Sequence, residues 1–405
     1  MRPFVSTLPL DRALAIIQTA ATPIDVVEHV TLEAAAGRVL ARHIDATLDV
    51  PPFDRSAMDG FAVVANDTVG ASPTTPVVLD VVSTIYAGDS PGSTTDGIQP
   101  GQCCEIATGA PLPPGADAVV MVEDTERQGD DRVRVRTPAA PFQHVGRRGS
   151  DVGAGGRALE CGAFLTTGRV GLLAALGTSA VPVYAKPEIA LASSGNEVVT
   201  SGRPLGPGQI YDVNAITLKA VVEAHGGRAR VHPPARDTLA DLARLLDTVA
   251  GAHLVVISGG SSVGDRDLLV DAVARRGEIL FHGIAVKPGK PTLFGRIGAQ
   301  LVLGMPGNPT SCLSNAYILL VPLLRTLARL PAHRPQLRRL PLSSAVKSTP
   351  ERHQFYPVRI DDERAVPVFK GSGDITSLSD ADGYIEIPIG VGSVAAGTLV
   401  DVKLF

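Results

Sequence analysis

With 405 residues, the chain is long enough to form several domains, each with its own hydrophobic core. Hydrophobic residues make up 44% and charged residues 19%, a balance typical of a globular protein. The net charge of −4, the absence of Trp and the 4% of aromatic residues argue against a nucleic-acid-binding function, and the charge gives no reason to expect binding to an anionic membrane.

The cysteines and the N-terminus exclude further classes. Cys103, Cys104, Cys161 and Cys312 form no C-x-x-C pair, and no His stands at zinc-finger spacing, so neither a structural zinc site nor a disulfide framework is expected. The N-terminal residues lack the apolar core of a signal peptide, and no apolar run reaches the ~20 residues of a transmembrane helix. We therefore expect a cytoplasmic protein with no membrane partner.

The first half of the chain is predicted to be rich in β-structure. Residues 10–20 have the pattern of a short amphipathic helix, and residues 39–50 look extended. Residues 61–140 alternate β-branched runs with Gly/Pro turns, at 77–82, 118–122 and 133–135. Residues 144–156 are typical of a connector, and a helix over 170–176 is expected to end at Gly177.

Two short motifs in this half carry candidate polar groups. Asp59 lies in the segment PPFDRSAMDGFAV, just before a predicted strand. Thr108 and Gly109 follow another strand, where a hydroxyl and backbone N–H groups can face an anion. The alternative for both motifs is an ordinary tight turn, since Asp-Gly alone favours a hairpin.

From Pro187 onward, strands and helices alternate. Strands are predicted at 189–192, 228–231, 254–257, 279–282 and 301–303, and helices at 214–225, 238–249, 268–275 and 311–330. Asp237 is placed to cap the helix over 238–249. This alternation predicts a doubly wound, mostly parallel α/β sheet.

The last part of the chain is predicted to be a small β domain after a Pro/Arg-rich linker at 330–341. Its β-runs lie at 354–360 and 384–389. The segment GVGSVA at 390–395 matches a loose dinucleotide fingerprint but lacks the following helix, so it is rejected. No G-x4-G-K-[ST] phosphate loop occurs in the chain.

The stretch from Leu254 to Ala316 carries the strongest functional pattern. A strand at 254–257 runs into a Gly/Ser loop before a helix, and such a loop can cradle a phosphate with its N–H groups and the helix N-terminus. The carboxylates of Asp265 and Asp267 follow, where they could hold Mg²⁺. The alternative is an ordinary capped βα turn. The predicted phosphate-loop residues are Gly259, Gly260, Ser261, Ser262 and Gly264.

Two further loops strengthen this interpretation. Lys287 and Lys290 stand in a proline-stiffened loop, KPGKP, and Pro306-Gly307-Asn308-Pro309 ends another apolar strand. Three such loops after strands of one sheet should gather at one edge, which is the ligand crevice of open α/β sheets.

Taken together, the motifs resemble the MoeA molybdopterin molybdenumtransferase family, which includes the gephyrin E domain. The resemblance rests on seven segments in the right order, which cover nearly the whole chain: PPFDRSAMDGFAV, ATGAPLPPGADAVVMVED, SSGNEV, ISGGSSVGDRD, AVKPGKPTLFG, GMPGNP and GSGDITSLSDADGYIEIP. It implies that adenylylated molybdopterin and molybdate are the substrates, that AMP is released, and that molybdenum remains on the dithiolene of the molybdenum cofactor.

The resemblance also implies an architecture. It implies a molybdopterin-binding α/β domain at 181–330, a β-rich domain inserted at 53–140, an elongated N-terminal linker/helical domain at 1–52 and 141–180, and a C-terminal β domain at 331–405. Members are homodimers, with a cleft between the α/β domain of one subunit and the β domain of the other. Protein partners would be the upstream adenylyltransferase and recipient molybdoenzymes.

Site residues are carried over motif by motif. The catalytic assignments are Asp59, Thr108, Asp237, Asp267 and Lys287. The binding assignments add Lys290, Pro306, Gly307, Asn308 and Pro309 to the phosphate loop. Asp267, with Glu197 or Asp237, is expected to hold Mg²⁺, and no general base is identifiable from spacing.

Four positions depart from the family pattern. They are Gly146, Ser150, Asn196 and Gly283, where an Arg, a Glu, an Asp and a basic or polar residue are common. The alternative functions are therefore a diverged paralogue that hydrolyses a nucleotide pyrophosphate, and a cofactor-binding or scaffold protein without metal insertion.

Overall fold

The computed structural model describes residues 7–90, 96–260 and 267–405. Four residues of the predicted phosphate loop and its carboxylate pair, Ser261, Ser262, Gly264 and Asp265, lie outside the described residues. The chain divides into two compact units. The larger unit comprises residues 1–28, 37–39 and 183–405, and the smaller unit comprises residues 29–36 and 40–182.

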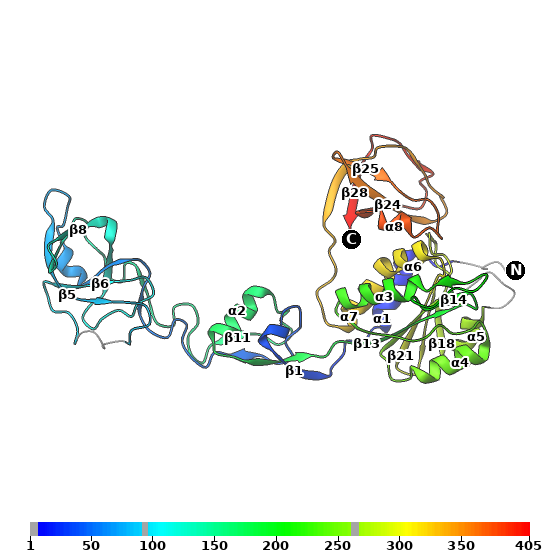
Figure 1. Ribbon diagram of the computed structural model, residues 1–405, viewed down its shortest axis with the longest axis horizontal. Helices are drawn as coiled ribbons and strands as arrows, with labels where there is room; N and C mark the ends of the chain where they lie inside the picture. The colour runs from blue at the N-terminus through cyan, green and yellow to red at the C-terminus, as the bar shows by residue number, and fades with distance from the viewer. Residues whose placement is uncertain (1–6, 91–95, 261–266) are drawn as a thin grey trace. The chain divides into compact units, whose positions relative to one another are not determined.

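A six-stranded sheet forms the centre of the larger unit (Figure 1). Its order is β16 (Arg228–Val231), β13 (Glu188–Ser194), β17 (Leu254–Gly259), β21 (Gln300–Met305), β20 (Leu293–Ile297) and β18 (Glu278–His282). The first four strands pair in parallel, whereas β20 is antiparallel to both of its neighbours. All strands except β20 thus run in one direction, which confirms the predicted mostly parallel sheet. The sequence pattern missed β20.

Helices cover both faces of this sheet. Successive residues of β13 point to opposite faces, so that Ile189 and Leu191 enter one core while Ala190 and Ala192 enter the other. The first core is covered by α1 (Leu10–Ala20), α3 (Val213–Ala224) and α7 (Val321–Leu327), and the second by α4 (Leu239–Thr248) and α5 (Leu268–Ala274). Figure 1 shows these helices on the two sides of the strands. This three-layer arrangement is the predicted doubly wound α/β domain.

One helical stretch combines α6 (Pro309–Asn315), the π-helical turn η4 (Ala316–Leu320) and α7. Within the described residues, it is the one helix whose length and hydropathy would suit a membrane span. However, 72% of the most apolar 18-residue segment of this stretch is buried inside the protein, where η4 packs in the core of the larger unit. The stretch is therefore accounted for as a core helix.

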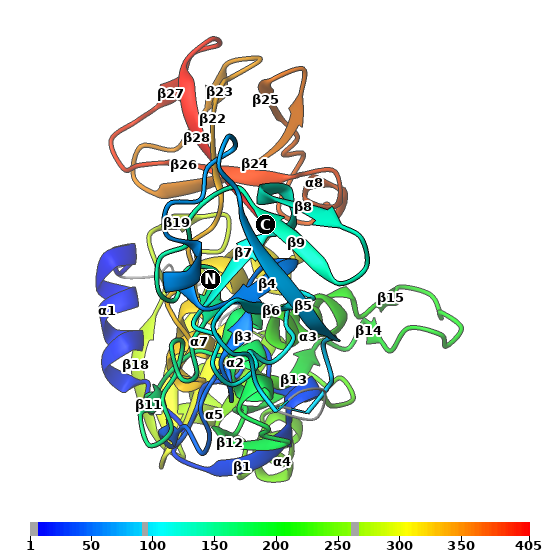
Figure 2. The ribbon, with the colours of Figure 1, turned by 90° about the vertical axis from the view of Figure 1, so that its left-hand side faces the viewer.

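The C-terminal part of the larger unit is a small β structure, as predicted. Its sheet has the order β19 (Val286–Lys287), β24 (His353–Asp361), β26 (Gly383–Ile387), β28 (Leu399–Leu404) and β22 (Leu337–Pro341), with β25 (Arg364–Pro367) also paired to β24. β22 occupies the end of the predicted linker. β19 comes from the Lys-Pro-Gly-Lys segment, which the sequence assigned to the α/β domain. A short projection, β14 (Val198–Val199) and β15 (Ile210–Tyr211), extends from the α/β layers (Figure 2).

The smaller unit is built mainly around a second six-stranded sheet. Its order is β7 (Ala118–Met121), β4 (Gly60–Val63), β6 (Gln102–Ile106), β5 (Val77–Ile85), β9 (Arg132–Val135) and β8 (Thr125–Gln128). The three β-runs predicted between residues 61 and 140 correspond to β5, β7 and β9. The predicted helix is α2 (Thr167–Ala175), and Gly177 follows it with φ +72°. The stretch at 39–50 contains only the two-residue strand β2 (Ile44–Asp45).

Candidate functional site

The carboxyl ends of the aligned strands lie level at one edge of the large sheet. Ser194, the last residue of β13, is in register with Gly259 of β17, and Ser258 is in register with Met305 of β21. β18 runs in the same direction and ends at His282, so the Lys-Pro-Gly-Lys loop also begins at this edge. The structure therefore brings the described start of the Gly/Ser loop, Gly259 and Gly260, to the same edge as the other two predicted loops, where open α/β sheets bind their ligands.

The Gly-Gly turn after β17 requires residues without a side chain. Gly259 and Gly260 have φ values of +86° and +68°. A Cβ atom on Gly259 would lie 2.3 Å from the carbonyl oxygen of Ser194. A Cβ on Gly307 would lie 3.4 Å from Cα of Gly259, so the two glycine loops are in contact. The close packing therefore requires glycine at this turn, and a glycine backbone also lets an anion approach its N–H groups closely.

A buried polar network links β13, β17 and the start of α3, and sequence reasoning missed it. Asp212 caps α3 by accepting the N–H of Ala215 at 3.0 Å, and it accepts the hydroxyl of Ser193 at 2.7 Å. Ser193 lies 2.8 Å from the hydroxyl of Ser258, the residue before the Gly-Gly turn. All three polar side chains are buried. The signal available in the sequence was Asp212 at the start of a predicted helix, where a capping carboxylate is expected.

Asn214 connects the same helix start to the third loop. Its side-chain amide donates to the carbonyl oxygen of Gly307 at 2.8 Å. The amide oxygen of Asn214 is buried without a hydrogen-bond partner among the described residues. A buried polar atom of this kind is a candidate for a contact with a ligand or an ordered water.

Asp237 faces the sheet edge instead of capping a helix. Its carboxylate accepts a hydrogen bond from the hydroxyl of Ser194, and its N–H donates to the side-chain oxygen of Asn196 at 3.3 Å. The cap of α4 is Thr238, whose hydroxyl accepts the N–H of Asp241 at 3.1 Å. The predicted cap was therefore wrong by one residue, because the carboxylate of Asp237 is engaged at the end of β13.

Asp267 and Glu197 are, with Asp237, the carboxylates that were predicted to bind a metal ion. Asp267 caps α5 by accepting the N–H of Val270 at 3.2 Å, and its other oxygen lies 3.1 Å from Nε2 of His282. The carboxylate of Glu197 folds back over Gly195, whose Cβ position would lie 2.8 Å from one of its oxygens. Among the described residues, no three His, Cys, Asp or Glu side chains are grouped closely enough to hold a metal.

The lysine loop is held on two sides. β19 pairs with β24, so that Lys287 is in register with Gln354. On the other side, Asn315 donates to the carbonyl oxygen of Gly289 at 2.9 Å and to the hydroxyl of Thr292 at 2.7 Å. Lys290 is half-buried, and its carbonyl oxygen accepts the N–H of Thr292 at 3.0 Å. The two lysines thus stand on a rigid backbone.

Gly289→Ala should lower the stability of the protein by about 2–4 kcal/mol, because left-handed strain is added to the loss of buried hydrogen bonds. Gly289 has φ +106°, and a Cβ there would lie 2.3 Å from the side-chain oxygen of Asn315. Gly298→Ala is the matched control, since Gly298 also has positive φ but open space around it. Urea unfolding followed by circular dichroism measures both variants, and equal shifts would contradict a role for the Asn315 contact.

The Pro-Gly-Asn-Pro loop starts a helix and contacts the C-terminal β structure. Pro309 is the first residue of α6, where a proline costs no hydrogen bond. Asn308 donates to the hydroxyl of Ser372 at 2.9 Å, and Thr310 donates to the carbonyl oxygen of Asp374 at 2.7 Å. Pro306 is buried and Gly307 is exposed. Hence this loop, like the lysine loop, is fixed by residues more than sixty positions later in the chain.

In the smaller unit, the structure brings Asp59 and Thr108 together. One carboxylate oxygen of Asp59 accepts the N–H of Thr108 at 2.7 Å and its hydroxyl at 2.9 Å. Both residues are exposed. The backbone N–H of Thr108, and then its hydroxyl, hold the pKa of Asp59 below its usual range. Asp59 is thus a pre-oriented, ionised carboxylate on the surface.

Thr108→Val should raise the pKa of Asp59 part of the way to its ordinary value, because the hydroxyl is lost while the N–H remains. The depressed pKa of Asp59 in the folded state contributes stability above its ordinary pKa, and this contribution is lost as pH falls through the folded value. Carboxyl-detected NMR titration measures the change, with Thr108→Ser as the control that keeps a hydroxyl. An unchanged titration in Thr108→Val would show that the hydroxyl plays no part.

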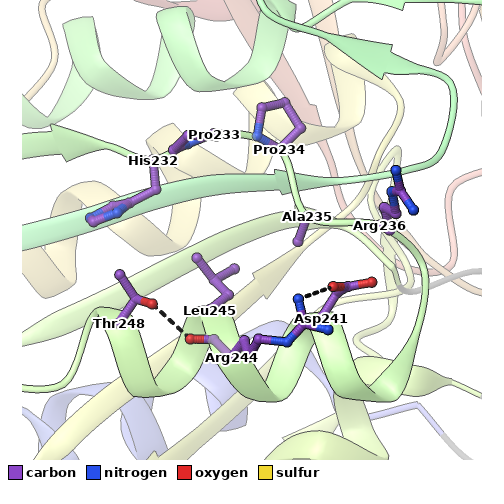
Figure 3. Close-up of a pocket in the computed structure, with 9 residues that line it drawn as sticks. All are labelled: His232, Pro233, Pro234, Ala235, Arg236, Asp241, Arg244, Leu245 and Thr248. Atoms are coloured by element: carbon purple, nitrogen blue, oxygen red, sulfur yellow. Dashed lines mark hydrogen bonds and ion pairs between the residues drawn. The ribbon is translucent and has the colours of Figure 1, made fainter.

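Open cavities lie beside the sheet edge and do not coincide with the predicted residues. One, of about 480 Å³, lies between the segment at 232–236 and α4 (Figure 3). Figure 3 shows Arg244 paired with Asp241 along the helix and Arg236 on the opposite wall. A second, of about 780 Å³, lies against β14, β15 and α3. The candidate site is therefore defined by its loops and not by either cavity.

Comparison with known proteins finds similarity along almost the whole chain. Residues 8–177 match the MoeA N-terminal region (domain I and II), residues 191–326 match a probable molybdopterin binding domain, and residues 339–405 match the MoeA C-terminal region (domain IV). Molybdopterin molybdenumtransferase 2 of Mycobacterium tuberculosis is 37% identical over 402 residues, which cover 96% of this chain and 97% of the relative. The molybdopterin molybdenumtransferase of Haemophilus influenzae is 32% identical over 396 residues, 93% and 94% of the two chains.

Solved structures agree over the same length. The molybdopterin biosynthesis MoeA protein of Pyrococcus horikoshii superposes with a TM-score of 0.82 at 40% identity, covering 98% of this chain and 99% of that chain. A second MoeA structure from the same organism superposes with a TM-score of 0.85 at 29% identity, covering 99% and 100%.

Proposed function

The chain belongs to the MoeA molybdopterin molybdenumtransferase family, and we propose that it inserts molybdate into adenylylated molybdopterin with release of AMP. The observation that carries the proposal is the single sheet edge that gathers the Gly-Gly turn, the Pro-Gly-Asn-Pro loop and the lysine loop. Backbone N–H groups and two lysines are the groups that bind a pyrophosphate, which is the bond that this reaction cleaves.

The lysine side chains and the glycine backbone at this edge have distinct roles in the proposed reaction. Lys287 and Lys290 balance the charge of the phosphates as point cations. Gly259 and Gly260 allow the backbone to approach the phosphates closely. Molybdate, an anion, is a substrate and needs the same positive potential. The loops thereby lower the cost of bringing two anions together.

Mg²⁺ fits the donor set by type. Carboxylate oxygens are its preferred protein ligands, and Asp237, Asp267 and Glu197 follow strand ends at the same edge. Asp267 and Asp237 would hold the ion, and Glu197 would add a third carboxylate. When bound, the ion polarises a phosphoryl oxygen and neutralises developing charge. Among the described residues these carboxylates do not form a cluster of three, and substrate phosphates commonly supply the remaining ligands of Mg²⁺.

The protein is also proposed to act as a cytoplasmic homodimer. Asp59 and Thr108 would complete the site of the partner copy. This fits the exposed carboxylate of Asp59, which Thr108 orients. The upstream adenylyltransferase would supply the substrate, and recipient molybdoenzymes would take the product. These assignments rest on family membership. The shared site of the homodimer can be tested by subunit exchange, as described in the Discussion.

Of the four departures from the family pattern, Gly283 has a local structural reason, and the contacts of the other three do not explain the change of residue. Gly283 has φ +87°, a backbone conformation that glycine adopts without strain. Asn196 accepts the N–H of Asp237 through its side-chain oxygen, a contact that an Asp could also make. Gly146 lies in β10 (Val145–Gly146), where its Cβ would be 3.4 Å from the side chain of Arg55. Ser150 donates its N–H to the carbonyl oxygen of Arg147 at 3.1 Å, a turn that does not depend on its side chain.

The test is the release of AMP from adenylylated molybdopterin with and without molybdate. A molybdenumtransferase should release AMP in a molybdate-dependent manner and should restore nitrate reductase activity in a strain without its own enzyme. Release that ignores molybdate would instead indicate a nucleotide pyrophosphate hydrolase. Binding without any release would indicate a cofactor-binding or scaffold protein.

A further inference from the structure

The tip of Lys287 is held by the C-terminal β structure. Its ammonium nitrogen donates to the hydroxyl oxygen of Thr349 at 2.8 Å. Thr349 lies just before β24, and both side chains are half-buried. A lysine that the sequence places in the α/β domain therefore has its partner 62 positions later in the chain.

The backbone beneath this contact has little freedom. β19 and β24 pair in parallel, with Val286 opposite His353 and Lys287 opposite Gln354. Asn315 fixes the other side of the loop at Gly289, as described above. The remaining freedom of Lys287 is that of its four-carbon side chain, and the contact with Thr349 restricts that freedom. Ordering a lysine side chain is among the larger side-chain entropy costs.

The chemistry of the acceptor is as informative as its position. A hydroxyl is neutral, so this contact orders the ammonium group without cancelling its charge. Two other lysines form ion pairs instead: Lys403 lies 2.6 Å from Glu386, and Lys219 lies 2.7 Å from Glu223. With the described residues, Lys287 forms no such ion pair, and its positive charge remains available to an anion.

We propose that Thr349 is a positioning residue for the reaction, which orients the ammonium group of Lys287 for the substrate's pyrophosphate. The proposal rests on the proposed function of Lys287 and adds a residue to it. Because the side chain is ordered before the substrate binds, binding does not have to supply that ordering. The C-terminal β structure thus contributes to the site through a residue that need not touch the substrate.

The test compares Thr349→Val with Thr349→Ser. Valine keeps the shape of the side chain and removes the acceptor oxygen. We therefore expect kcat/KM for molybdate-dependent AMP release to fall roughly three- to tenfold, the size expected for the loss of one typical hydrogen bond. Thr349→Ser keeps the oxygen and should recover most of the loss. Ser348→Ala is the matched neighbour: it removes the 3.1 Å contact of Ser348 with Gln354 and should leave turnover unchanged.

A double-mutant cycle with Lys287→Ala separates positioning from general support of the fold. If Thr349 acts through Lys287, Thr349→Val should have no further effect in the Lys287→Ala background. Equal losses in both backgrounds, or no loss in the wild-type background, would overturn the proposal. Thr349→Ala provides a second variant if Thr349→Val does not fold, as judged by circular dichroism.

Binding of ADP, which contains a pyrophosphate, can be measured without the reaction. It therefore tests the role of Thr349 independently of the proposed function. Wild-type protein without molybdate-dependent AMP release would refute the proposed function, and calorimetric titration with ADP would then decide the role of Thr349. Weaker ADP binding in Thr349→Val, restored in Thr349→Ser, supports the positioning role. The same ADP affinity in all three proteins overturns it.

Discussion

Mixing the variants Asp59→Asn and Asp267→Asn under conditions of subunit exchange should restore activity to about a quarter of the sites. The reason is symmetry: if Asp59 of one copy serves the sheet edge of the other, each mixed dimer contains one intact site and one doubly damaged site. Random exchange makes about half of the dimers mixed, and half of their sites are intact. AMP release per subunit measures the recovery.

The parent variants must each be inactive, and exchange must be verified by mass spectrometry of differently tagged copies. No recovery under those conditions would mean that each site is built from one copy, because every site would then keep a defect. Asp59→Asn keeps an oxygen that can accept the N–H of Thr108, so a folding defect is not expected. The recovery therefore reports on which copy supplies the carboxylate.

Asp267→Asn alone should lower AMP release by roughly a hundredfold, the order expected when several kcal/mol of metal-assisted stabilisation is lost. The side-chain oxygen of asparagine can still cap α5 at Val270, so the helix should remain folded. The amide lacks the negative charge that a hard cation requires. EDTA should cause a comparable loss in the wild-type protein, with recovery on addition of Mg²⁺.

Asp271→Asn is the matched control, because it removes a negative charge from the first turn of the same helix. Its activity should stay close to that of the wild type. If Asp271→Asn were as damaging as Asp267→Asn, the effect would belong to the helix and not to a metal ligand. Full turnover of the wild-type protein in EDTA would remove the metal assignment altogether.

Secondary structure with strong local signals was predictable from the sequence. Leu10–Ala20 has the predicted bounds because a clear apolar period of a helix coincides with it, and Arg228–Val231 has them because arginines alternate there with apolar residues. β20 was missed, since Leu293–Ile297 follows two prolines closely and contains a glycine. Its strand conformation comes from pairing with β18 and β21, which no local pattern reveals.

The site was predictable as a set of loops but not as a set of contacts. Glycine and proline clusters located the sheet edge, because those residues have strong backbone preferences. The partners of the site residues could not be found in this way: Thr108 lies 49 positions from Asp59, and Thr349 lies 62 positions from Lys287. Contacts at such separations depend on the packing of whole domains. The cap at Asp237 failed for the same reason, since Ser194 lies 43 positions earlier.

The pairing of β19 with β24 has a consequence for synthesis on the ribosome. Val286 cannot form its strand pair until its partner, His353, has been made. This requires the translation of 67 further residues (353 minus 286). At about 5–20 residues per second, the delay is several seconds. In the later part of that interval, after β21 has been made, the nascent chain has its α/β strands but not the strand β24 that pairs beside Lys287. The lysine loop therefore reaches its final structure only late in synthesis, after His353 has been made.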